Sequence, residues 1–133
     1  MSNWQSSNIA TAANEVREAM RGNLRSDYTL AKTLRKLKSV LDDGEFIRFL
    51  MDEEVGLSVA QATAYKYERM VSAYDVIQTE KVWERIGWEG ISKVVKIQKR
   101  NEQVAVCRAV VREPRHIGKQ LLADIMADKA PSY

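Results

Sequence analysis

The sequence predicts an all-α protein, a compact bundle of several helices that contains a helix-turn-helix unit. Apolar residues recur at intervals of three and four over most of the chain, as on the buried face of a helix. Glycine (6) and proline (2) are too scarce to supply the turns of a sandwich or barrel. The length of 133 residues and an apolar content of 45% suit one core, so residues 1–133 are expected to form a single helical domain.

Two helices are expected before residue 42. The first begins after a cap at Ser7 or Asn8 and runs to about Arg21, where Gly22 stops it. Its apolar stripe consists of Ile9, Ala12, Ala13, Val16 and Met20. The second begins after Ser26 or Asp27 and runs to about Leu41. Its expected buried face consists of Leu30, Leu34, Leu37 and Leu41.

Two further helices are expected on either side of a glycine turn. The third runs from Glu45 to about Glu54, and its inward residues are Phe46, Phe49 and Leu50. The fourth begins at Ser58 and runs to about Tyr74 or Ile77. Ser58 and Gln61 have the spacing of a capping box. The inward residues expected of this helix are Ala62, Tyr65, Met70 and Val71.

Basic helices are expected over residues 80–128. A short one, from Glu80 after Thr79 to Ile86, is broken by the sequence Gly87-Trp88-Glu89-Gly90, and the next runs from Ile91 to Arg100. Residues 103–111 fit either a helix or a strand. We favour a helix, because no second strand-like segment exists to pair with a strand. A last helix from Ile117 to Asp128 follows Pro114.

Residues 45–74 have the spacing of a helix-turn-helix unit around Gly56. Its usual apolar positions are occupied by Met51, Val55, Leu57, Ala62 and Tyr65. Asp52 departs from the pattern, because a small residue usually stands four positions before the glycine.

In such a unit the second helix enters the major groove of double-stranded DNA. The side chains expected to face the DNA are Ser58, Val59, Ala60, Gln61, Thr63, Ala64, Lys66, Tyr67 and Arg69. Among them Gln61 suits adenine, while Lys66 and Arg69 suit phosphates. Two alternatives remain open: this helix is simply exposed to solvent, or its alanines pack on another helix.

The charge pattern places an acidic zone between two basic ones. Residues 41–57 carry a net charge of −5, whereas residues 1–40 and 80–133 each carry +4. Within the second basic zone Lys93, Lys96 and Arg100 have the spacing of one helical stripe, which suits a phosphate backbone or a solvated face. DNA would repel the acidic segment 42–54, so this segment indicates a protein partner or an internal salt bridge.

The composition excludes other classes. A single cysteine (Cys107) and a single histidine (His116) leave no disulfide framework and no metal site. No apolar run approaches the roughly 20 residues of a membrane span, and the polar N-terminus lacks the pattern of a secretory signal. Phosphate-binding loops and glycine-rich dinucleotide turns are absent. We therefore expect a cytoplasmic protein that is not an enzyme, binds no cofactor and has no membrane partner.

Residues 44–74 resemble a phage- and plasmid-associated helix-turn-helix family of unknown function. The residues that carry the resemblance are Gly44-Glu45-Phe46, Leu50, the acidic run, Gly56-Leu57-Ser58, Gln61-Ala62 and Tyr65. The resemblance implies a DNA-binding regulator of a prophage, plasmid or integrative element. Gln61 stands where the family favours threonine, so the family's base preference is not carried over.

Two functions follow from these patterns. The first is a sequence-specific DNA-binding regulator that acts as a homodimer, because one helix per half-site gives little affinity. The second is a helical protein-interaction module, such as an anti-activator, inhibitor or replication adaptor, that binds its partner through the acidic segment 42–54.

Overall fold

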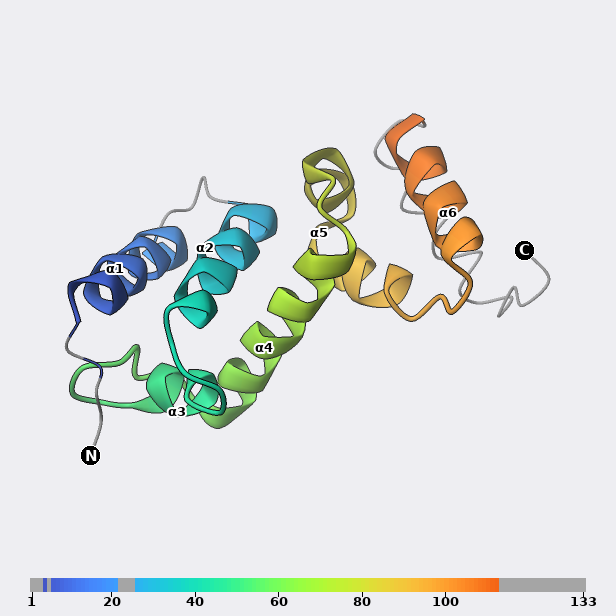
Figure 1. The fold of residues 1–133 in the computed structure, drawn as a ribbon. Helices are drawn as coiled ribbons and strands as arrows, with labels where there is room; N and C mark the ends of the chain where they lie inside the picture. The colour runs from blue at the N-terminus through green and yellow to red at the C-terminus, as the bar shows by residue number, and fades with distance from the viewer. Residues whose placement is uncertain (1–3, 5, 22–25, 113–133) are drawn as a thin grey trace. The chain divides into compact units, whose positions relative to one another are not determined.

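The computed structural model describes residues 4, 6–21 and 26–112, and these residues form six helices and no strand (Figure 1). The helices are α1 (Ser7–Arg21), α2 (Asp27–Ser39), α3 (Phe46–Met51), α4 (Gln61–Val76), α5 (Glu80–Val94) and α6 (Arg100–Arg112). The predicted all-helical class is confirmed for this part of the chain. None of the six helices is long and apolar enough to cross a membrane. Pro114, His116 and the helix predicted from Ile117 to Asp128 lie outside the described residues.

The described residues divide into two compact units. The N-terminal unit contains the described residues 4, 6–21 and 29–74, and the C-terminal unit contains residues 26–28 and 75–112. The boundary therefore falls within α2 and near the end of α4.

Helix α1 begins at Ser7, after Ser6, whose hydroxyl accepts the backbone N–H of Ile9 at 3.2 Å. The cap is therefore one residue earlier than predicted. The predicted stripe is buried except for Met20, which is 41% exposed, and Ala19 is buried instead. Ala19 follows the buried Val16 by three positions, so the stripe continues on the same face.

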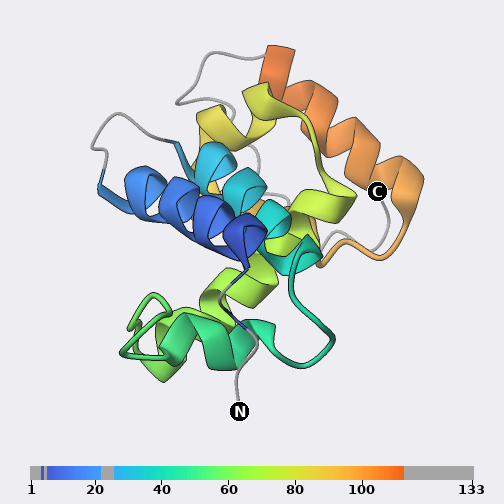
Figure 2. The same cartoon turned by 60° about the vertical axis from the view of Figure 1, so that its left-hand side comes forward.

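Helix α2 lies beside α1 in both views, and the two are joined by a salt bridge of 3.1 Å from Lys36 Nζ to Glu15 Oε2 (Figures 1 and 2). It ends at Ser39 and not at Leu41, because the N–H groups of Val40 and Leu41 bond to carbonyls only three residues back. Leu34 and Leu37 are fully buried as predicted. Leu30 and Leu41 are half-buried, and Ala31 completes the buried face.

Helix α3 buries Phe46, Phe49 and Leu50, which confirms the predicted inward face. Trp4 packs edge-on against Phe49, with ring centroids 5.3 Å apart. The helix ends at Met51, three residues before the predicted Glu54. It ends there because Asp52 has an extended backbone and its carboxylate accepts the N–H groups that follow it.

Helix α5 begins after Thr79 as predicted and bends at Gly87, where the backbone leaves the helical region (φ 65°, ψ −175°). The predicted break is confirmed at Gly87 only, because residues 88–90 are helical. Glycine adopts its positive φ without steric cost. The carboxylate of Asp27 accepts the N–H of Trp88 at 2.8 Å and so binds the bend to the start of α2. Trp83 is 1% exposed, stacks on Trp88 and donates its Nε1–H to the Ile77 carbonyl at 2.6 Å.

Residues 103–111 lie within α6, so the favoured helical interpretation is confirmed. The predicted helix from Ile91 to Arg100 is wrong, because α5 ends at Val94 and the next residues form a turn. Gln103, which is 6% exposed, donates its Nε2–H to the Val94 carbonyl at 3.4 Å and accepts a hydrogen bond from Arg100 at 3.1 Å. This glutamine provides a partner for the end of α5 and joins it to α6.

Candidate functional site

A nine-residue loop, residues 52–60, connects α3 to α4 (Figure 2). It is longer than the three- or four-residue turn that joins the helices of a helix-turn-helix. The loop folds back on α3, because Leu57 donates its N–H to the Phe49 carbonyl at 3.3 Å and Val59 donates to the Leu50 carbonyl at 3.0 Å. The end of α3 thereby positions the start of α4.

The predicted N-cap at Ser58 is wrong. Helix α4 begins at Gln61, and its first turn contains the bond from the Ala64 N–H to the Ala60 carbonyl at 2.9 Å. Ser58 donates its own N–H to the Asp52 carbonyl at 3.1 Å and has a positive φ of 53°. The residue therefore belongs to the loop, and the capping box with Gln61 does not form.

The two central positions of the predicted recognition helix are also wrong. Ala64 is 0% exposed and Tyr67 is 8% exposed, although both were expected to face DNA. Conversely, Ala62 is exposed and Tyr65 is 44% exposed, although both were expected to pack inward. The buried pair thus lies two positions further along the chain than predicted. Burial also raises the pKa of the Tyr67 hydroxyl above its ordinary value.

The outer side of the first half of α4 is polar and basic. Gln61, Lys66 and Arg69 are exposed there as predicted, and Tyr65, which the sequence placed inside, joins them. We call these four residues the α4 outer face. Ser58 and Ala60 in the loop are exposed, whereas Val59 and Thr63 are half-buried. The predicted inward positions Met70 and Val71 are buried, so the opposite side packs on the core.

The loop before α4 is bound to α1 through Arg17. The guanidinium donates to the Gly56 carbonyl at 2.9 Å and to the Val55 carbonyl at 3.4 Å. It also donates to the side chain of Asn14 at 2.8 Å, one turn earlier in α1. No local spacing in the sequence connects Arg17 with residues so far along the chain, so this interaction was not predicted.

Asp52, the first residue of the same loop, stabilises it through side-chain hydrogen bonds to the loop backbone. Its carboxylate accepts the N–H groups of Glu54 and Val55, both at 2.9 Å, and that of Gly56 at 3.4 Å. These hydrogen bonds, led by those from Val55 and Glu54, lower the pKa of Asp52 below its ordinary value. A Cβ atom at Gly56 would fall on the Phe49 carbonyl oxygen, so the loop lies too close to α3 for any side chain there. Asp52, which departs from the helix-turn-helix pattern, therefore stabilises the loop by accepting these hydrogen bonds.

The acidic segment 42–54 presents four exposed carboxylates, which belong to Asp42, Asp43, Glu53 and Glu54. Glu45 is half-buried and pairs with Arg48 at 3.8 Å. Glu53 and Glu54 lie in the loop and not in the last turn of α3, which ends at Met51. Within the described part of the chain no three acidic, histidine or cysteine side chains gather to hold a metal ion.

The predicted basic stripe of Lys93, Lys96 and Arg100 does not form. Lys93 lies in the last turn of α5, Lys96 in the turn after it and Arg100 at the start of α6. The stripe requires one continuous helix, and the chain bends after Val94. Arg100 instead donates to Gln103 at 3.1 Å and to the Val76 carbonyl at 3.5 Å.

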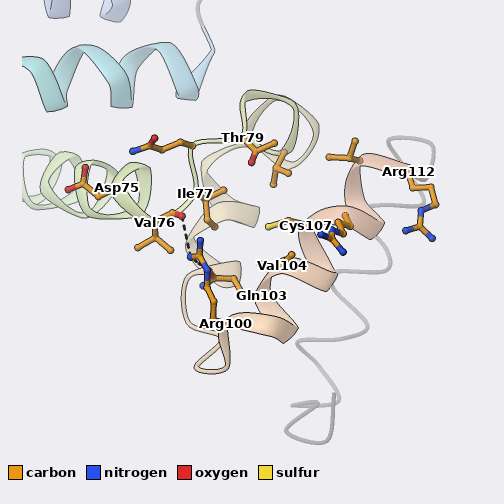
Figure 3. Close-up of a pocket in the computed structure, with 13 residues that line it drawn as sticks. Asp75, Val76, Ile77, Thr79, Arg100, Gln103, Val104, Cys107 and Arg112 are labelled. Atoms are coloured by element: carbon orange, nitrogen blue, oxygen red, sulfur yellow. Dashed lines mark hydrogen bonds between the residues drawn. The ribbon is translucent and has the colours of Figure 1, made fainter.

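The C-terminal unit contains an open groove of about 770 Å³ along α6 (Figure 3). One wall is formed by the end of α4, the connection 77–79 and Val82 of α5, and the other by α6. Cys107 lines this groove, and its side chain is half-buried. Burial raises the pKa of the Cys107 thiol, and the positive charge of Arg100 acts in the opposite direction.

Comparison of the chain with protein-family models, with curated proteins and with solved structures found no match.

Proposed function

We propose that the protein is a DNA-binding regulator that contacts double-stranded DNA with the α4 outer face. The observation that carries the proposal is the burial of Ala64 and Tyr67 on one side of α4 and the exposure of Gln61, Tyr65, Lys66 and Arg69 on the other. A buried alanine lets a helix pack closely on its neighbours, while its other side remains accessible to a groove. The proposal keeps the predicted unit at residues 45–74 and changes which side chains of α4 face the DNA.

The chemistry of this face suits DNA. The amide of Gln61 at the start of α4 pairs with adenine in the major groove. Lys66 and Arg69 lie five and eight residues further along the helix, where cationic side chains bind phosphates. Tyr65 provides a hydroxyl donor for a phosphate oxygen and an apolar ring for a thymine methyl.

The loop geometry supports the same function. A recognition helix must be held in one orientation for its side chains to select bases. Arg17 donates hydrogen bonds to carbonyls of the loop, and the Asp52 carboxylate accepts hydrogen bonds from its N–H groups. These side chains therefore fix the backbone of the loop that precedes α4. The N-terminus of α4 is thereby positioned by α1 and α3.

Titration of duplex DNA at several salt concentrations tests the proposal. The probes are the DNA upstream of the protein's own gene and a duplex of scrambled sequence. We expect Gln61→Ala to weaken specific binding about tenfold or more. Arg69→Ala should weaken binding to both duplexes and lower the slope of the salt dependence by about 0.9 for each phosphate that the variant no longer neutralises.

Matched controls are exposed residues outside α4. Gln78→Ala and Lys32→Ala remove an exposed amide and an exposed cation elsewhere and should leave binding unchanged. Failure of the wild-type protein to bind either duplex at low salt would reject the proposal. Equal losses in the control variants would show that the α4 outer face is not the interface.

We also propose that the protein acts as a homodimer in the cytoplasm and belongs to a mobile element. A dimer binds two half-sites and so doubles the contact area available to one helix. Light scattering of the free protein and the stoichiometry of the DNA complex test this part. A monomer that binds one half-site with full affinity would contradict it.

A second candidate function is favoured by the exposed carboxylates of Asp42, Asp43, Glu53 and Glu54. In this alternative the acidic segment 42–54 binds a basic protein surface and the chain is an interaction module. The double variant Glu53→Gln/Glu54→Gln separates the two functions. DNA binding that becomes tighter in this variant at low salt favours the regulator, because two repulsive charges next to α4 are removed. If neither the wild-type protein nor the double variant binds DNA, the result favours the interaction module.

A further inference from the structure

The groove along α6, which we call the α6 groove, has apolar side chains on both walls (Figure 3). On α6 itself, Val104 and Val111 stand seven residues apart and therefore on one face of the helix, and both are half-buried. On the facing wall Val76 is 42% exposed, whereas Val82 is buried. An occupant of the α6 groove would therefore remove apolar surface of both walls from water.

Three exposed arginines, Arg100, Arg108 and Arg112, line the same groove. Asp75 is the only carboxylate among the described lining residues, so three positive charges stand against one negative charge. Arg100 is held in place by the hydrogen bond that it donates to the Val76 carbonyl at 3.5 Å. The charge complementary to the α6 groove is therefore negative.

The positive charges are spread along the α6 groove and do not converge on one point. Arg100 and Arg112 are the first and last residues of α6, so a rise of 1.5 Å per residue separates their backbones by about 18 Å. Figure 3 shows the two side chains well apart, with Val104 and Cys107 between them. A small anion would meet only one of these arginines, whereas a polypeptide with several acidic side chains along its length can approach all three.

We propose that the α6 groove binds an amphipathic helix of a partner protein. The apolar stripe of that helix packs between Val104 and Val111 on one wall and Val76 on the other, and acidic side chains along its edge approach the three arginines. Helices that bind in grooves use apolar side chains at intervals of three, four and seven residues, and Val104 and Val111 have the last of these intervals. The α6 groove lies in the C-terminal unit, and its role does not depend on the contact with DNA proposed for α4.

An exchange of charge between the full-length protein and synthetic helical peptides tests the proposal. The acidic probe is a fluorescent peptide of about 14 residues, as long as α6, with leucines at intervals of three and four and glutamates along one edge. The basic probe has lysines in place of the glutamates. Fluorescence anisotropy at low salt should show that the wild-type protein binds the acidic probe at least about tenfold more tightly.

Reversal of one charge in the protein should change this preference. We expect Arg108→Glu to weaken binding of the acidic probe about fivefold and to strengthen binding of the basic probe by a similar factor. Arg21→Glu makes the same change at an exposed arginine of the N-terminal unit and should alter neither affinity by more than about twofold. Equal behaviour of the two variants would overturn the proposal.

A change in the apolar wall provides a second variant. Val111→Asp should weaken binding of the acidic probe about tenfold, because the new carboxylate would be buried without a partner and would repel the glutamates. Val40→Asp introduces the same side chain at an exposed valine of the N-terminal unit and should leave the affinity unchanged. Far-UV circular dichroism checks that both variants keep the helical content of the wild type. Unchanged affinity in a folded Val111→Asp variant would contradict the proposal.

Cys107, the only cysteine of the chain, reports where the probe binds. Because its thiol lines the α6 groove, a saturating concentration of the acidic probe should slow its alkylation about tenfold. The basic probe at the same concentration is the control. An alkylation rate that bound acidic probe leaves unchanged would place the peptide elsewhere on the protein and overturn the proposal.

Three further outcomes would also overturn it. Absence of binding of the acidic probe at about 1 mM would show that the α6 groove accepts no such helix. Protection of Cys107 by duplex DNA and not by the acidic probe would assign the arginines to a nucleic acid. A dimer of the protein that dissociates when the acidic probe is added, as measured by light scattering, would assign the α6 groove to a second copy of the chain.

Discussion

Arg17 donates a hydrogen bond of 2.9 Å from its guanidinium to the backbone carbonyl of Gly56, 39 residues further along the chain. This bond joins the middle of α1 to the loop that precedes α4. The same guanidinium also reaches the Val55 carbonyl. The position of the α4 outer face therefore depends on a helix that has no part in the proposed interaction with DNA.

Replacement of Arg17 tests this dependence. We expect Arg17→Ala to lower the free energy of unfolding by about 1–2 kcal/mol, because the variant cannot make the hydrogen bonds of the charged donor. Chemical denaturation measures this change. Arg21→Ala, one turn later in α1 and exposed, is the control and should alter stability little. Equal stability of both variants and the wild type would show that Arg17 does not hold the loop.

The two glycines on either side of α3 should respond differently to alanine. Gly56→Ala places a Cβ on the Phe49 carbonyl and 2.8 Å from the Cβ of Asp52, so we expect a loss of about 3 kcal/mol or more. Gly44 has a φ of +81° with open space around it, so Gly44→Ala should cost only about 1–2 kcal/mol of backbone strain. Thermal unfolding of both variants measures the difference. A larger loss at Gly44 would contradict the close approach of the loop to α3.

The orientation of α4 is tested by adding the same side chain at two alanines. Ala64→Leu should lower stability by about 1–3 kcal/mol, since Ala64 is 0% exposed and the site has no room for three more carbons. Ala62→Leu should change stability by no more than about 0.5 kcal/mol, because Ala62 is exposed. Urea denaturation measures both values. A larger loss of stability for Ala62→Leu than for Ala64→Leu would contradict this orientation and support the one predicted from the sequence, in which Ala62 packs inward.

Asp52 should make the stability of the protein depend on pH in the acidic range. Its pKa is lowered in the folded chain from an ordinary value near 3.8, because the carboxylate accepts backbone hydrogen bonds. The stabilisation is therefore fully present above the unfolded pKa and is lost as the pH falls through the folded pKa.

The variant Asp52→Asn isolates this effect. Its amide oxygen accepts the same bonds without a charge, so it should be less stable than the wild type at pH 7. The difference should shrink as the pH falls below about 4, because the unfolded wild-type chain binds a proton at Asp52 before the folded chain does. Denaturation midpoints at several pH values measure it, with Asp43→Asn in the preceding turn as the control. A difference that grows towards low pH would contradict the assigned role.

Much of the fold follows from local patterns. The inward residues of α3, most of the stripe of α1 and the bend at Gly87 were all predicted, because helical periodicity and glycine conformation depend on neighbours in the sequence. The stripe of Lys93, Lys96 and Arg100 was wrong for a different reason. Its spacing is helical, but Gln103 bonds to the last carbonyl of α5 and the chain turns before the stripe is complete.

The sequence by itself determined that the chain is helical and which side of most helices is apolar, since both properties repeat at helical intervals. It did not determine which side of α4 faces outward. Alanine is followed by tyrosine three residues later at both Ala62 and Ala64, so two orientations of the helix have equal local support. Only the tertiary structure decided between them. Hydrogen bonds from the distant Arg17 and to Asp52 hold residues 52–60 in a loop, so α4 begins at Gln61 and not at Ser58.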